Sequence, residues 1–75
     1  MKASGRTRHD EKITVYLTRD ELARLDKLVT HIRHDLGIKT DRGRLVREAL
    51  GLVREDVTRA GRKSAVVRRL QEATA

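Results

Sequence analysis

A short segment near the N-terminus alternates strictly between apolar and polar residues. Its apolar positions are Ile13, Val15 and Leu17, and its polar positions are Lys12, Thr14 and Tyr16. This period of two predicts a β-strand over residues 12–17 with one apolar and one polar face. No second segment shows the pattern, so the backbone partners of this strand must come from another copy of the chain. We therefore expect a homodimer joined by a two-stranded antiparallel ribbon.

Two longer segments place apolar residues at helical spacing. Before the first, Thr18 and Glu21 have the spacing of a capping box, and Gly37 is placed to end that helix. The second follows Thr40 or Asp41 as its N-cap and ends near Gly61. The apolar stripe of the first helix is Leu22, Leu25, Leu28, Val29, Ile32 and Leu36, and that of the second is Leu45, Val46, Ala49, Leu50, Val53 and Val57.

These patterns divide the chain into three parts. Residues 1–10 are polar and basic and are expected to form a flexible arm. Residues 11–60 hold the strand and the two helices, and residues 61–75 are an extension in which Lys63 to Glu72 could form a short third helix. We expect the shared core of the dimer to contain Ile13, Val15, Leu17, Leu22, Leu25, Leu45, Val46, Ala49 and Leu50.

Composition narrows the classes of function. The chain has 75 residues, a net charge of +7 and no cysteine, and its only aromatic residue is Tyr16. A small, strongly basic chain suits a polyanionic partner, nucleic acid first and an anionic membrane second. The sequence has no signal-peptide pattern and no apolar stretch of membrane-spanning length, which favours a cytoplasmic protein. It shows no nucleophile-and-base constellation and no phosphate loop, so we expect neither an enzyme nor a cofactor.

The order strand, helix, turn, helix resembles the ribbon-helix-helix family of DNA-binding proteins, which includes the Arc and methionine repressors. The resemblance covers Lys12 to Val57, about two thirds of the chain. It is carried by the alternating Lys12–Leu17 segment, the cap Thr18, the Leu22/Leu25 start of the first helix, Gly37, and the segment Arg44-Leu45-Val46-Arg47-Glu48-Ala49-Leu50. The fold that it implies is a mainly α homodimer with an intermolecular β-ribbon.

The resemblance also implies how such a dimer would contact DNA. The polar face of the ribbon, at Lys12, Thr14 and Tyr16, would read base edges in the major groove. The N-terminus of the second helix would meet the DNA backbone, because its unpaired N–H groups and its dipole suit a phosphate. The phosphate-binding positions would be Thr40, Arg42, Gly43 and Arg44, and the arm would add Lys2, Arg6 and Arg8. Departures from the family pattern are Tyr16, a longer turn after Gly37, and Asp41 beside the phosphate site.

His31 and His34 are three residues apart, a spacing at which two imidazoles can share a metal ion. No cysteine or nearby carboxylate cluster accompanies them on the same face. We therefore expect no metal site and interpret both as exposed helix histidines.

The expected function is sequence-specific binding of double-stranded DNA by a homodimer, with transcriptional repression by occlusion as the first choice of role. Adjacent dimers could cooperate on repeated sites. Three other roles remain open: a plasmid partition protein with an ATPase partner contacting Arg6 or Arg8, an antitoxin, or a relaxosome accessory protein. In the antitoxin the toxin-binding anchors would be Val66, Val67 and Leu70.

Overall fold

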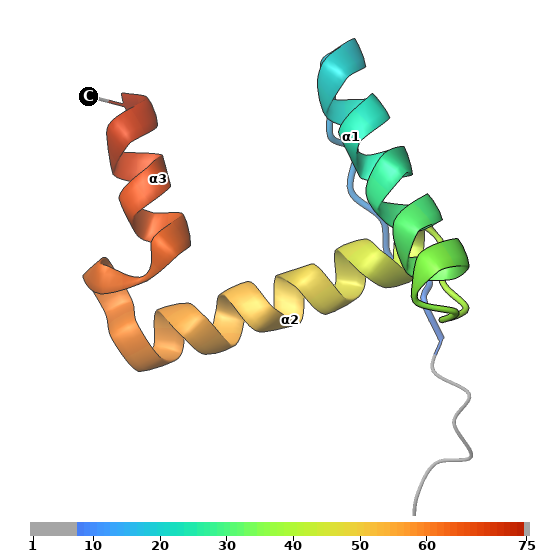
Figure 1. Cartoon of the computed structure of the whole chain (residues 1–75). Helices are drawn as coiled ribbons and strands as arrows, with labels where there is room; N and C mark the ends of the chain where they lie inside the picture. Colours follow the sequence, from blue (N-terminus) through green and yellow to red (C-terminus); the bar gives the residue numbers. More distant parts are fainter. Residues whose placement is uncertain (1–7, 75) are drawn as a thin grey trace, which may run out of the picture.

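The computed structural model describes residues 8–74, and every regular element within that range is helical (Figure 1). The elements are helix α1 (Arg19–Thr30), a π-helical turn η1 (His31–Asp35), helix α2 (Arg42–Ala60), a 3₁₀ turn η2 (Gly61–Lys63) and helix α3 (Ala65–Thr74). Helices α1 and α3 lie at opposite ends of the longer α2 (Figure 1). The short third helix expected from the sequence is therefore present.

The strand expected at residues 12–17 is not formed. Residues 8–18 have no regular secondary structure, and no strand occurs anywhere between residues 8 and 74. A β-strand exists only where its N–H and C=O groups pair with a neighbouring strand, and the described part of the chain offers no such neighbour. The expected ribbon-helix-helix fold with an intermolecular β-ribbon is therefore wrong, and the described residues form an all-α structure.

Helix α1 begins where its capping sequence predicts. The Glu21 N–H donates to Thr18 Oγ1 at 3.0 Å, and the Thr18 N–H donates to Glu21 Oε1 at 2.8 Å. These two bonds complete the capping box, and they satisfy N–H groups that the first turn of a helix leaves without partners. The prediction of this helix start is confirmed.

The far end of α1 is wider than an ordinary helix. At η1 the Leu36 N–H donates to the carbonyl oxygen of His31 at 3.2 Å, one residue further back than in an α-helix. Gly37 follows with a φ of 69°, a left-handed conformation that glycine adopts without a Cβ penalty. The helical segment thus ends at the residue expected from the sequence, although its last turn is π-helical.

Helix α2 is bounded by an aspartate and a glycine. Asp41 is its N-cap and accepts a hydrogen bond from the Arg44 N–H at 2.8 Å. Of the two candidate caps, Asp41 rather than Thr40 has its side chain in position to reach this amide. Gly61, with a φ of 54°, ends the helix as predicted. The turn η2 then redirects the chain into α3, which runs crosswise to α2 (Figure 1).

A single chain buries very little apolar surface. Val29 is the only buried hydrophobic residue among those described. Of the residues expected in a dimer core, Leu25 and Leu45 are half-buried and the other seven are exposed. The radius of gyration is 15.2 Å, whereas a compact domain of this length has about 11 Å. The described chain is therefore an open arrangement of helices with uncovered apolar faces.

Candidate nucleic-acid interface

A groove of about 680 Å³ lies between the irregular N-terminal segment and the first half of α2. It is lined by Arg8, His9, Asp10, Glu11, Lys12, Ile13, Gly43, Val46, Arg47 and Leu50. Three of these residues, Arg8, Lys12 and Gly43, were predicted DNA contacts. The structure therefore brings the N-terminal segment and the N-terminal end of α2 together at one site.

The predicted base-reading residues do not all share this groove. Lys12 lines it, whereas Thr14 and Tyr16 lie outside its lining. Both are exposed, and Tyr16 is 95% exposed. All three side chains are accessible to a ligand, but only Lys12 adjoins α2.

The arm residues are only partly described. Lys2 and Arg6 lie outside the described residues. Arg8 forms an exposed ion pair with Asp10, with Arg8 Nη2 at 3.8 Å from Asp10 Oδ2. An exposed pair of this length is weak, so the Arg8 guanidinium remains accessible to a stronger anion such as a phosphate.

The N-terminus of α2 already holds a carboxylate. Asp41 Oδ1 accepts the Arg44 N–H, so one first-turn amide expected at a phosphate is occupied. Thr40 Oγ1 donates to the Asp41 carbonyl oxygen at 3.4 Å. This bond is long, and it does not make the Thr40 hydroxyl a cap of the helix. A phosphate bound at this end of α2 would therefore lie near the negative charge of Asp41, which already interacts with the positive end of the helix dipole.

Arg42 is engaged in a two-pronged ion pair with α1. Its Nε and Nη2 donate to Asp26 Oδ1 and Oδ2, each at 2.8 Å. The Arg42 hydrogen bond holds the pKa of Asp26 below its ordinary value, and the same bond raises the pKa of Arg42. Arg42 thus links α1 to the start of α2 within the chain, although a phosphate contact was predicted for it.

Arg47 is a basic residue of the site that was not predicted. A Cβ placed on Gly43 would lie 3.3 Å from Arg47 Nη1 and 3.5 Å from Asp41 Oδ1, so the guanidinium lies close over the glycine. Residues three apart lie on one side of a helix, and the predicted Arg44 is three residues before Arg47. This spacing was the signal in the sequence that would have identified Arg47.

No group of three or more potential metal-binding side chains occurs within residues 8–74. The one close contact of the two helix histidines is the pair formed by His31 Nδ1 and Asp35 Oδ2, 2.6 Å apart. None of the described helices is long and apolar enough to cross a bilayer.

No protein-family model matches the chain, and neither a curated protein nor a solved structure matches it.

Proposed function

We propose that this chain binds double-stranded DNA as a homodimer and represses transcription by occluding the DNA that it covers. The observation that carries the proposal is the groove in which Arg8 and Lys12 of the N-terminal segment adjoin Arg47 of α2. Three cations from two distant parts of the chain there outnumber the two acids, Asp10 and Glu11. A net charge of +7 adds a long-range attraction for a polyanion.

The residues of the site divide into two chemical roles. Lys12 can donate to guanine O6 and N7, and Thr14 can hydrogen-bond a base edge or contact a thymine methyl group in the major groove. Arg44 and Arg47 supply positive charge along α2 for the phosphates. Neither arginine side chain forms an ion pair within the described residues, in contrast to Arg42.

The open shape of the chain supports a homodimer. Large apolar side chains from the N-terminal segment and α2 are uncovered, among them Ile13 at 79%, Val15 at 65% and Leu50 at 57% exposure. A second copy is the partner that is always present to cover such faces, and a symmetric pair would present every DNA-contacting residue twice. The proposal requires no β-ribbon, because Lys12 and Thr14 are already exposed on the irregular N-terminal segment.

A salt titration of DNA binding tests the electrostatic half of the proposal. Each phosphate contact that a basic residue makes contributes about 0.9 to the slope of log K against log salt on duplex DNA. Arg47→Ala should lower the slope by about that amount for each copy of the chain bound. The matched control is Arg54→Ala, which removes the same charge from α2 at a position outside the groove. Equal slopes for these two variants, measured by fluorescence anisotropy, would contradict the role of Arg47.

Base reading is tested by comparing a selected site with random duplex. Lys12→Ala should lower the preference for the selected site by about 1–3 kcal/mol, while the helical circular dichroism of the protein stays unchanged. Unchanged preference would remove Lys12 as a reader of bases. No salt-dependent binding to any duplex by the wild-type protein would overturn the proposed function as a whole.

A further inference from the structure

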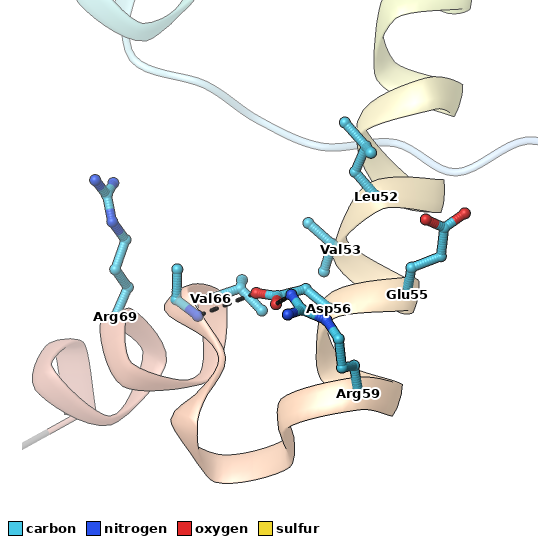
Figure 2. A pocket seen from close by; sticks show the side chains of 8 residues that line it. Leu52, Val53, Glu55, Asp56, Arg59, Val66 and Arg69 are labelled. Atoms are coloured by element: carbon cyan, nitrogen blue, oxygen red, sulfur yellow. Dashed lines mark hydrogen bonds and ion pairs between the residues drawn. The ribbon is translucent and has the colours of Figure 1, made fainter.

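A second groove, of about 580 Å³, lies at the other end of α2 where the chain turns into α3. Its lining residues are Leu52, Val53, Glu55, Asp56, Arg59, Ala65, Val66 and Arg69 (Figure 2). Leu52 is 66% exposed and Val53 is 38% exposed, so the apolar part of this groove is uncovered within the chain. The DNA-binding role proposed above uses none of these residues.

Two hydrogen bonds help to hold the shape of this groove. Asp56 Oδ2 accepts the Ala65 N–H at 3.2 Å, which ties the start of α3 to the side of α2. Ser64 is 1% exposed, and its Oγ donates to the Gly61 carbonyl oxygen at 2.8 Å across the turn. The angle between α2 and α3 is thus set before any partner binds, which lowers the ordering cost of binding there.

The charges around the groove are self-complementary. Asp56 is paired with Arg59, which leaves Glu55 on α2 and Arg69 on α3 as the other charged residues of the lining. Neither forms an ion pair within the described part of the chain. Figure 2 shows them on opposite sides of the groove, with Val53 and Val66 between them. A two-fold axis that relates two such grooves places the acid of each copy beside the base of the other. One acid and one base on either side of an apolar centre can therefore pair in both directions.

We propose that this groove is a self-association surface that binds the same groove of a second copy of the chain. The apolar side chains Leu52, Val53 and Val66 pack against their counterparts about the two-fold axis. Glu55 of each copy then pairs with Arg69 of the other, because an isologous contact occurs twice.

This surface is separate from the candidate nucleic-acid interface. The 19 residues of α2 span about 28 Å, and the two grooves lie toward its opposite ends. If the proposed function holds, contacts here join one DNA-bound unit to the next on repeated sites. The self-association itself does not depend on that function, and it is tested without DNA.

Charge reversal gives a test with internal rescue. In chains that carry Val15→Lys, which blocks the separate homodimer contact, Glu55→Arg alone or Arg69→Glu alone places like charges together and should weaken the self-association constant, measured by sedimentation equilibrium, by about tenfold or more. The double variant exchanges the two charges and should restore the wild-type constant at unchanged net charge. Arg54→Glu makes the same charge change as Arg69→Glu but at a position of α2 outside the groove, so it is the matched control and should leave the constant near the wild-type value.

Every outcome of this test decides the proposal. Weakening in both single variants with rescue in the double variant supports it, whereas constants that match the Arg54→Glu control overturn it. Weakening without rescue also overturns it, because the charges then do not pair across the interface.

Cross-linking provides a readout that is independent of charge. Because the chain contains no cysteine, Leu52→Cys introduces a single thiol in the groove. A short bismaleimide should join two Leu52→Cys chains into a covalent dimer, and adding Glu55→Arg should suppress the product. If Glu55→Arg does not reduce the cross-linking, the proposal is overturned. Leu52 would then lie in a different contact, or the groove would bind a different partner.

Discussion

Arg42 stands at the first position of α2, where the sequence suggests a phosphate contact, yet its guanidinium is held by Asp26 of α1. The two side chains are 16 residues apart in sequence and meet through two hydrogen bonds of 2.8 Å. Because the pair is exposed, it adds little to the stability of the fold, and its main effect is to orient the two helices. It fixes how the start of α2 sits beside α1, and it leaves Arg44 and Arg47 as the accessible cations of this region.

Removing the carboxylate of Asp26 should lower stability in a pH-dependent manner. The pKa of Asp26 is lowered from its ordinary value of 3.8 by the Arg42 hydrogen bond. Its stabilising contribution is therefore fully present above pH 3.8 and is lost as the pH falls from there through the lower folded-state pKa. Asp26→Asn should lower the melting temperature at neutral pH, and the difference from wild type should shrink in strong acid.

The Asp26 prediction has a matched control in Arg42. Arg42→Gln should lower the neutral-pH melting temperature similarly, and the double variant should add little further loss, because both changes remove one interaction. A melting-temperature difference between Asp26→Asn and wild type that is constant with pH would contradict the pairing.

The helices begin and end where a few neighbouring residues dictate. Thr18 with Glu21 starts α1, Gly37 ends its π-helical extension, and Gly61 ends α2. Capping depends on side chains within three or four positions of the helix end, so it can be read from the sequence. The π-helical turn η1 could not be predicted in this way, since an ordinary α-helical turn would place the same apolar stripe almost as well.

Gly51, in the middle of α2, offers a test of helix propensity. A Cβ at this position has nothing within 4 Å, so an added methyl group meets no neighbour in the chain. Gly51→Ala should raise the free energy of unfolding by up to about 1 kcal/mol. Gly37→Ala is the contrasting variant and should destabilise, because Gly37 has a φ of 69°. A loss of stability in Gly51→Ala would show that this face of α2 is covered by another chain.

The corner between α2 and α3 depends on the carboxylate of Asp56. Asp56→Ala removes the acceptor of the Ala65 N–H and should cost about 1 kcal/mol of local stability, as the loss of a helix cap does. Hydrogen exchange should accelerate in α3 and not in α1, while Asp56→Asn, which keeps an acceptor oxygen, should show a smaller effect. Equal protection of α3 in wild type and Asp56→Ala would contradict this role.

At the scale of the whole molecule, the described residues include one buried hydrophobic side chain and many exposed ones. Its extents of 43 × 36 × 26 Å describe an open shape, and α1 and α3 have no common core. Small chains without disulfides or metals are commonly stabilised by association, since one copy cannot remove enough apolar surface from water. The uncovered apolar side chains of the described residues are the observation behind the proposed homodimer.

Its thermal stability should therefore depend on protein concentration. When folding and association are linked, the melting temperature rises with concentration because mass action favours the assembled state. Scanning calorimetry over a wide concentration range should show this rise. A variant with Val15→Lys should show a lower melting temperature, because the lysine charge would have to enter the contact with the second copy. A melting temperature independent of concentration in the wild type would contradict the homodimer.

The sequence by itself determined where the helices of the described residues lie, the capping residue Thr18, and the glycine stops at Gly37 and Gly61, and it left the cap of α2 open between Thr40 and Asp41. These features depend on propensities and side chains close together along the chain, so a local pattern suffices. The strand at residues 12–17 was wrong because alternation fixes only which side chains share a face, whereas a strand requires a hydrogen-bonded neighbour.

Only the tertiary structure decided which distant side chains meet. It paired Arg42 with Asp26, brought Lys12 and Arg47 to one groove, and joined Asp56 to the first turn of α3. These contacts depend on the angles between helices, which no periodicity encodes, because one apolar stripe is compatible with several crossing geometries. The charge and the helices of this protein follow from its sequence, whereas the composition of the two grooves follows from how α2 is set against the N-terminal segment at one end and against α3 at the other.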